Sequence, residues 1–292
     1  MPPIPPPYAS GFTTSTPFPL YYARHGTAGA PPLLLLHGGP GASYDYLLPQ
    51  LLELDTIAEG GRDLILYDQR GGGRSRHDED RATIGWQDQA ADVGRVIGEF
   101  GLERPRIVGY SWGALLALLY ALEAAEGRLG PMPAQLILID PAPLSRAYRE
   151  TFEAEFARRQ ASPEVQQLRA ELAESGLRES DPDTYRHRAF ELSVAGYFAD
   201  PRKARDLTSF RVVGRVQQSI WASLGDYDLF ARLETLRIPT VVVHGRQDPI
   251  PLESSERAAR ALDAEFVVIE ECGHVPYVEQ PAALLSALAP SV

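Results

Sequence analysis

Ser111 has the residue type and the surroundings that nucleophilic catalysis requires. It is the centre of Gly-Tyr-Ser-Trp-Gly at residues 109–113, which follows the apolar run 106–108 and precedes the breaker-free apolar stretch 114–122. At a tight turn from a strand into a helix, a serine stands exposed on strained backbone at the positive end of the helix. A serine hydroxyl reacts only when a base removes its proton and an acid orients that base. The pattern therefore predicts a nucleophile, and the base and the acid must come from elsewhere.

The last two apolar runs of the chain each end at a residue that could complete this chemistry. Asp248 follows the run 241–243, and His274 follows the run 266–269. Serine, aspartate and histidine in this chain order are typical of the α/β-hydrolase fold. We therefore predict that His274 accepts the Ser111 proton and later donates it to the leaving group, and that Asp248 fixes the tautomer of His274.

Other residues compete for these roles. An aspartate before proline, as Asp248 is, often only forms a turn. Asp140 and Asp263 are the alternative acids. The alternative bases are His25, His77, His187 and His244. Unlike His274, none of these histidines follows a glycine in a loop after a strand. Cys272 is expected to be a small packing residue.

A tetrahedral intermediate needs backbone N–H donors for its oxyanion. The residue after the nucleophile, Trp112, is predicted to supply one donor. The second is predicted to be Gly39 in the loop 37–41, His-Gly-Gly-Pro-Gly, because Pro40 has no N–H. Phosphate binding is the alternative function of this loop, but neither Gly-Lys-Ser/Thr nor Gly-x-Gly-x-x-Gly follows it.

The elements that must position these residues alternate between strands and helices. Short, continuously apolar runs that end at glycine, proline or aspartate predict parallel strands covered on both faces. In the first half these runs are 33–36, 64–67, 106–108 and 136–139. Helices are predicted over 86–100 and 112–126. This order indicates an α/β fold with an open, mostly parallel sheet and functional loops at the carboxyl ends of the strands.

The pattern changes near Ser145 and resumes after about residue 232. Between these points there is no comparable strand signal, and helices are predicted over 147–160, 163–175 and 183–198. Strand signals return at 239–243 and 266–269, followed by a closing helix at 281–289. We therefore predict a core of residues 1–144 and 233–292, with a helical cap of residues 145–232. Residues 1–17 are expected to form an extended arm.

Composition excludes several classes of protein. The net charge of −11 argues against nucleic-acid binding, which requires a basic surface. The single cysteine allows neither an intramolecular disulfide nor a cysteine metal cluster. Residues 1–7 lack the basic and apolar regions of a signal peptide, and no apolar run reaches the ~18 residues of a membrane span. A cytoplasmic protein is the expectation, and the sequence does not fix an oligomeric state.

Taken together, these motifs resemble the proline iminopeptidase-like family of α/β-hydrolases. The resemblance implies a serine peptidase that removes an N-terminal residue, usually proline, from small peptides without a metal or cofactor. It also implies that Asp68 and Arg70 are structural. The matching segments cover roughly 20–144 and 233–290, and they are 37–41, 68–75, 109–113, 244–248 and 272–281.

The match is weaker in the predicted cap. Peptidases of this type are expected to hold the free amine of the substrate with cap glutamates, one of them three residues before a Tyr-Phe pair. Here the pair is Tyr197-Phe198, and that position is Val194. Glu191 lies one helical turn earlier and is the candidate replacement, with Tyr197 beside it, since residues three apart share a helix face. The alternative is that Glu191 is only a solvated carboxylate.

Three functions remain open from the sequence. The first is an aminopeptidase that releases proline or a small apolar residue. The second is a carboxylesterase or C–C bond hydrolase with the same triad and an apolar cap. The third is a binding protein that kept the fold, although such proteins often lose a triad member and all three are present here. Dehalogenase and epoxide-hydrolase chemistry normally requires aspartate in place of Ser111.

Overall fold

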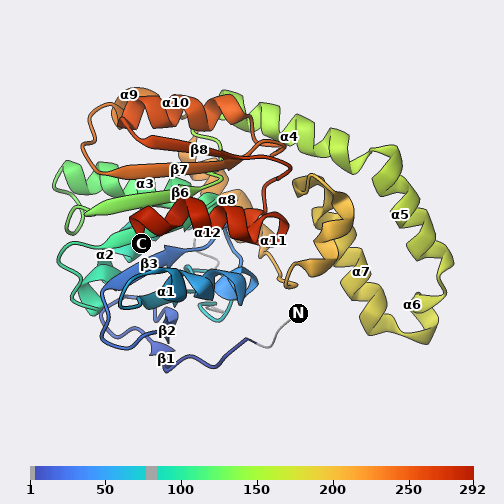
Figure 1. Ribbon diagram of the computed structural model, residues 1–292, viewed down its shortest axis with the longest axis horizontal. Helices are drawn as coiled ribbons and strands as arrows, with labels where there is room; N and C mark the ends of the chain where they lie inside the picture. The colour runs from blue at the N-terminus through green and yellow to red at the C-terminus, as the bar shows by residue number, and fades with distance from the viewer. Residues whose placement is uncertain (1–3, 77–83) are drawn as a thin grey trace.

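The computed structural model describes residues 4–76 and 84–292. A single eight-stranded sheet runs through the molecule in the order β1-β2-β4-β3-β5-β6-β7-β8, and helices cover both of its faces (Figure 1). The strands β3 to β8 pair in parallel, whereas β1 and β2 pair antiparallel at one edge. Their bounds are β1 Ala9–Phe12, β2 Tyr21–Gly26, β3 Pro32–Leu36, β4 Asp63–Tyr67, β5 Arg106–Tyr110, β6 Gln135–Ile139, β7 Thr240–Gly245 and β8 Glu265–Ile269.

Alternation of the apolar strand side chains divides the core into two layers. In β3, Leu34 and Leu36 belong to one buried cluster, while Leu33 and Leu35 belong to the other. Successive strand residues point to opposite faces, so a continuously apolar strand needs cover on both sides. The fold class predicted from the sequence, an α/β-hydrolase fold with a mostly parallel sheet, is therefore confirmed.

The helix α3 after β5 is buried along almost all of its length, with 12 buried residues among 14. The helices that cover the sheet are α1 Glu53–Ile57, α2 Trp86–Glu99, α3 Trp112–Ala125, α10 Leu252–Leu262, α11 Pro276–Glu279 and α12 Pro281–Leu288. Short 3-10 helices are η1 Tyr44–Leu47, η2 Gln50–Leu52 and η5 Ala289–Ser291.

Between β6 and β7 the described chain forms helices and loops, and part of this helical segment projects beyond one end of the sheet (Figure 1). Side-chain caps explain where they begin: Ser145, Ser162 and Asp181 each accept a hydrogen bond from a backbone N–H of the following turn. The elements are α4 Arg146–Gln160, α5 Pro163–Glu174, α6 Leu177–Ser180, α7 Pro182–Val194, η3 Ala195–Tyr197, η4 Pro201–Asp206, α8 Gly214–Leu224 and α9 Phe230–Leu233.

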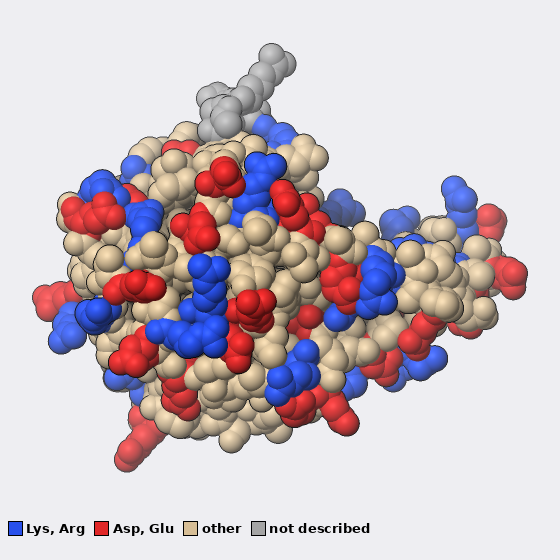
Figure 2. Space-filling model, turned by 90° about the horizontal axis from the view of Figure 1, so that it is seen from above, with Lys and Arg blue, Asp and Glu red and all other residues tan. Residues whose placement is uncertain are grey.

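The surface mixes charges of both signs. Figure 2 shows acidic and basic side chains interspersed on the face it presents, including the projecting helices. Several pairs on α4 lie one turn apart, such as Arg146 with Glu150 and Arg149 with Glu153. Among the described residues, the helices are too short or too polar to cross a bilayer.

The sequence did not predict the first two strands. Residues 9–12 pair with residues 21–24, and β2 continues onto β4, so the expected extended arm contributes an edge of the sheet. The β1 residues alternate between intermediate and exposed positions, which leaves no apolar run to signal a strand. Similarly, α8 and α10 went unpredicted because their buried residues occupy one face only, among exposed polar side chains.

Candidate active site

The turn at Ser111 is imposed by packing of the glycines around it. A Cβ on Gly113 would lie 2.0 Å from the carbonyl oxygen of Leu36, and one on Gly109 would lie 2.5 Å from the Cα of Ala114. Both positions therefore require glycine. Ser111 itself has φ 53° and ψ −118°, a strained conformation for a residue with a side chain. Its backbone N–H donates to the Ile139 carbonyl at 2.9 Å, which anchors the turn to β6.

Three side chains from the loops after β5, β7 and β8 form one hydrogen-bonded chain. His274 Nε2 lies 2.9 Å from Ser111 Oγ, and His274 Nδ1 lies 2.7 Å from Asp248 Oδ2. The second Asp248 oxygen, Oδ1, accepts from the N–H of Ile250 at 2.7 Å. The structure thus brings together the serine, base and acid predicted from the sequence. This geometry can carry a proton from Ser111 to His274 while the carboxylate orients the ring.

Two tyrosines, Tyr110 and Tyr197, contact both the backbone and the ring of His274. Tyr110 O–H donates to the His274 carbonyl at 2.8 Å, and the His274 N–H donates to the Tyr197 carbonyl at 2.7 Å. The ring centroids of Tyr110 and Tyr197 lie 5.3 and 5.1 Å from that of His274, the latter stacked. Of these contacts, those of Tyr197 come from the helical insertion between β6 and β7. The base is therefore fixed in part by the insertion.

Burial shifts the pKa values of His274 and Asp248. Burial lowers the pKa of the His274 imidazole, so its neutral, proton-accepting form is the resting form near neutral pH. Burial also raises the pKa of the Asp248 carboxyl group. The hydrogen bond from the Ile250 N–H opposes this shift, because it stabilises the carboxylate. Because the two groups share a hydrogen bond, they titrate as a unit.

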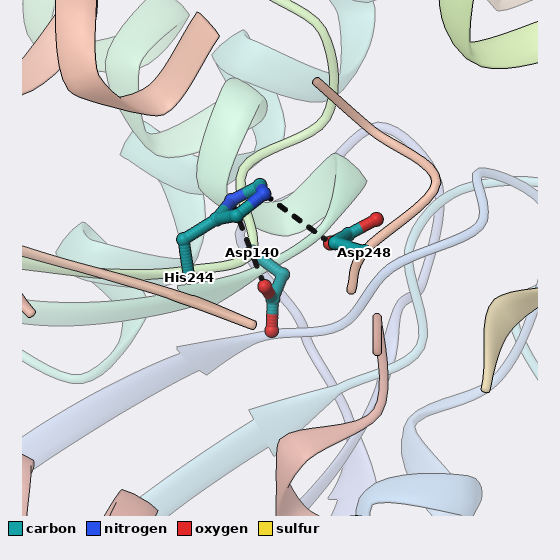
Figure 3. Close-up of side chains that lie close together, drawn as sticks. All are labelled: Asp140, His244 and Asp248. Atoms are coloured by element: carbon teal, nitrogen blue, oxygen red, sulfur yellow. Dashed lines mark ion pairs between the residues drawn. The ribbon is translucent and has the colours of Figure 1, made fainter. Parts of the chain in front are cut away.

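A second buried carboxyl group lies next to Asp248. Asp140 has φ 42° at the end of β6, its Oδ1 accepts from the Gly245 N–H at 2.8 Å, and His244 lies between the two acids (Figure 3). Burial, and then the charge of Asp248, raise the pKa of Asp140. The carboxyl group that hydrogen-bonds His274 is that of Asp248, whereas Asp140 is bound to the backbone of Gly245.

The same three residues have the donor types of a metal site. One atom from each of Asp140, His244 and Asp248 lies within 4.8 Å of the others. However, His244 Nδ1 hydrogen-bonds Ser255 at 2.9 Å, and its Nε2 lies 3.2 Å from the Ile250 carbonyl. Both oxygens of Asp248 are also used. The prediction that the protein uses no metal or cofactor remains a prediction.

The remaining alternative residues lie elsewhere. Asp263 is the C-terminal cap of α10, with φ 52°, and it precedes β8, whereas His274 follows that strand. His187 contacts Ser209 and Glu191 in the insertion, and His25 is buried in β2. His77 lies outside the described residues. Cys272 is fully buried, which raises the pKa of its thiol, in keeping with a packing role.

The loop at residues 37–41 faces the turn at Ser111. A Cβ on Gly38 would lie 3.0 Å from that of Ser111, and the Gly38 N–H donates to Tyr46 Oη at 2.6 Å. Gly39 has φ 132° and lines both cavities that contain Ser111. The Trp112 N–H is the first of α3 and lacks an intrahelical acceptor, as at every helix start. Both N–H groups are thus free of protein acceptors among the described residues.

Gln69 joins this loop to the turn, a role that the sequence analysis did not assign. Its Nε2 donates to the His37 carbonyl at 2.7 Å, and its backbone N–H donates to His37 Nε2 at 3.1 Å. Its Oε1 accepts from Trp112 Nε1 at 3.1 Å. Gln69 therefore connects the backbone of His37 to the indole of Trp112, whose Nε1 also lies 2.8 Å from Gln89 Oε1. The only signal was its position in the Asp-Gln-Arg motif.

The neighbours of Gln69 have structural contacts, as the resemblance implies. Asp68 accepts from the N–H of Tyr44 at 3.0 Å and from Arg74 Nε at 2.7 Å. Arg70 makes a two-pronged ion pair with buried Asp92, at 2.8 and 2.7 Å. These contacts hold the β4 loop in place beneath the site.

Two cavities open beside Ser111 and His274. One has a volume of about 140 Å³ and a largely aromatic and aliphatic lining, including Tyr46, Val194, Phe210 and Tyr277. The other has a volume of about 200 Å³ and a more polar lining, including Arg149, Glu153, Gln217 and Trp221. Ser111 thus lines both a mainly apolar cavity and a more polar one, and the two cavities share Gly39, Tyr197, Gln217 and His274.

The two candidate substrate-binding residues separate in the structure. Tyr197 lines both cavities. Glu191 lines neither: it is buried against His187 and Arg188, each 3.3 Å away, beside a different cavity. The structure therefore does not bring Glu191 to Ser111, because the face of α7 that carries it turns toward α5 and η4. The carboxylate that does line the Ser111 cavity is Glu153 of α4, which the sequence analysis did not single out.

Comparison with known proteins places this geometry in a family. The alpha/beta hydrolase family model matches residues 33–287. The chain is 27% identical to proline iminopeptidase of Lactobacillus delbrueckii subsp. lactis, over 86% of each chain, and 27% identical to that of Clostridioides difficile, over 93% of each chain. A solved proline iminopeptidase-related protein of Thermus thermophilus shares the fold, with TM-score 0.71 and 21% identity over 97% of this chain and 99% of that one. The chain belongs to the alpha/beta hydrolase family, and its resemblance to the proline iminopeptidases is confirmed.

Proposed function

We propose that this protein is a serine hydrolase that works through a covalent acyl-enzyme. The hydrogen-bonded chain from Ser111 through His274 to Asp248 is the observation that carries the proposal. Ser111 Oγ attacks the carbonyl carbon of the substrate as His274 Nε2 takes its proton. His274 then donates this proton to the leaving group, which departs. In the second half of the reaction His274 takes a proton from water, the water oxygen attacks the acyl carbon, and His274 returns the proton to Ser111 Oγ as the acid is released.

The backbone N–H groups of Gly39 and Trp112 are the proposed oxyanion donors. Negative charge develops on the carbonyl oxygen during attack, and preorganised donors stabilise it without reorganisation. The N-terminus of α3 adds its positive dipole at the same point. The Gln69 contacts support this role, since they connect His37, two residues before Gly39, to the side chain of Trp112.

The substrate that we favour is a small peptide with an N-terminal proline or small apolar residue. The curated relatives are proline iminopeptidases. The largely aromatic and aliphatic lining of the cavity beside Ser111 suits a pyrrolidine ring. In the polar cavity, Glu153 supplies a carboxylate for the free amine of the substrate. Its Oε1 accepts from Arg149 Nε at 2.8 Å, which leaves Oε2 to accept from an ammonium group.

Glu153→Gln is expected to raise KM for prolyl-p-nitroanilide about tenfold or more, because a hydrogen bond to a charged group contributes about 1.5–3 kcal/mol. Hydrolysis of p-nitrophenyl acetate, which has no amine, should change less than twofold. The measurement is steady-state kinetics on both substrates. Glu150→Gln is the matched control, since Glu150 lies one turn away and does not line the Ser111 cavity. Equal losses on both substrates would remove Glu153 from amine recognition.

A carboxylesterase or C–C bond hydrolase is the second candidate, and Val194 favours it. This residue occupies the position of an expected cap glutamate, and it lines the apolar cavity beside Ser111. An apolar residue there offers nothing to an ammonium group and suits an aliphatic acyl chain.

A paired screen distinguishes the two candidates. Prolyl-p-nitroanilide and p-nitrophenyl esters of increasing chain length are compared by kcat/KM, with Ser111→Ala as the blank. Preference for the prolyl amide supports the aminopeptidase. Ester activity that exceeds amide activity by orders of magnitude supports the esterase.

A further inference from the structure

Glu279 is a buried carboxylate outside the triad that contacts the loop carrying His274. It ends α11 and is 5% exposed. Its Oε2 accepts from the N–H of Gly273, the residue before His274, at 2.7 Å. Its Oε1 accepts from the N–H of Ala199 at 2.9 Å and from that of Asp200 at 3.4 Å. The two oxygens therefore bind two different segments of the chain.

The second segment belongs to the insertion between β6 and β7. Residues 197–200, which we name the cap strap, also contact the His274 loop directly through the Tyr197 carbonyl and ring. A Cβ on Gly273 would lie 2.3 Å from the Tyr197 carbonyl oxygen and 2.7 Å from the Ala199 nitrogen. Lys203 Nζ then donates to the Glu279 carbonyl at 3.1 Å. The cap strap and the His274 loop are thus packed without space between them.

We propose that Glu279 is a positioning residue that fastens the His274 loop to the cap strap, so that His274 is aligned with Ser111 only while the strap is seated. The proposal rests on the proposed serine-hydrolase function. It assigns to the insertion a part in catalysis besides binding substrate: displacement of the strap removes the acceptor of the His274 N–H and the ring stacked on His274. Access to the site and alignment of the base are then coupled.

The chemistry of a carboxylate explains why glutamate is needed here. Both of its oxygens accept hydrogen bonds, whereas an amide offers one acceptor and one donor group. In Glu279→Gln the amide has two possible orientations. If its oxygen faces the Ala199 N–H, its NH₂ group faces the Gly273 N–H. If it is flipped, its NH₂ group faces the Ala199 N–H. Either orientation breaks one side of the fastening, although the size of the side chain is unchanged.

Loss of the negative charge of Glu279 is expected to change the pKa of His274 as well. The carboxylate of Glu279 raises the pKa of His274, in addition to the larger effect of Asp140 and against the lowering caused by burial. The other ionisable groups around Glu279 are Lys203, Asp248 and Cys272, and the substitution leaves them in place. Without the Glu279 charge the imidazolium is less stable, so the His274 pKa falls. The acid limb of the kcat/KM profile therefore moves to lower pH.

The test compares Glu279→Gln with wild type and with Glu271→Gln, a control on the same loop whose side chain is exposed. For p-nitrophenyl acetate, we expect kcat to fall about tenfold to a hundredfold in Glu279→Gln with KM within about twofold, since small misplacement of a catalytic group costs this much. The acid limb should move to lower pH, and NMR titration of the His274 ring should give a lower pKa than in wild type. Glu271→Gln should match wild type in each measurement.

Two results would overturn the role of Glu279. One is kinetics indistinguishable from those of Glu271→Gln. The other is a lower kcat with a lower melting temperature but an unmoved acid limb and an unchanged His274 pKa, which is the behaviour of a merely structural residue. The NMR titration needs no turnover. A wild-type protein without hydrolase activity would therefore count against the proposed function, while the titration would still decide the role of Glu279.

Discussion

Ser111→Ala is expected to lower kcat by about 10⁴- to 10⁶-fold on any ester or amide that the protein hydrolyses, because the substitution removes the nucleophile. The fold should persist. The strained turn is held by the packing of Gly109 and Gly113 and by the Ser111 N–H bond to Ile139, and neither involves the hydroxyl. Some rate over the uncatalysed reaction should remain from the oxyanion donors.

The measurement for Ser111→Ala is kcat on prolyl-p-nitroanilide and on p-nitrophenyl acetate, together with a melting curve. The control is Ser193→Ala, a serine on α7 whose hydroxyl donates only to the local Phe190 carbonyl. Retention of activity within tenfold of wild type in a folded Ser111→Ala protein would place the nucleophile elsewhere.

Asp248→Asn is expected to lower kcat by about 10⁴-fold, the cost of holding the base in the wrong tautomer. The Ile250 N–H donates to Oδ1, so it selects the amide oxygen for that position and turns the NH₂ toward His274 Nδ1. Nδ1 must then be unprotonated, and the ring proton moves to Nε2. From there it faces Ser111 Oγ and blocks proton transfer.

Steady-state kinetics on the same two substrates measure this loss. Asp263→Asn is the matched control, because Asp263 ends α10 away from the site and asparagine also tolerates its positive φ. A loss smaller than tenfold in Asp248→Asn would mean that another acid orients His274, and Asp140 is the buried carboxyl group next to it.

The parts of the fold that the sequence predicts are those with a strong local signal. The apolar run 33–36 becomes β3, and the stretch 112–126 becomes α3, Trp112–Ala125, because each is buried on every side and its sequence shows it. The antiparallel strands β1 and β2 carry no such run. They form because β2 can add to the exposed edge of β4, a contact between residues about 40 positions apart.

The residues of the candidate site likewise include some that the sequence predicts and some that it does not. Ser111, Asp248 and His274 stand at the ends of recognisable strands, so their meeting follows from the topology of a parallel sheet. The contributions of Gln69, Glu153 and Glu279 depend on the packing of segments far apart in the chain. Glu191 illustrates the limit: its spacing from Val194 is that of a shared helix face, yet α7 ends at Val194 and the chain changes direction through η3 before Tyr197.

The central claim is that Ser111 is an activated nucleophile, and a covalent adduct tests it most directly. The protein is incubated with a small fluorophosphonate, its intact mass is measured, and the modified peptide is sequenced. We expect one adduct per chain, located on Ser111, and its rate of formation should fall by orders of magnitude in Asp248→Asn. No adduct on wild-type protein, or an adduct on another residue, would contradict the account.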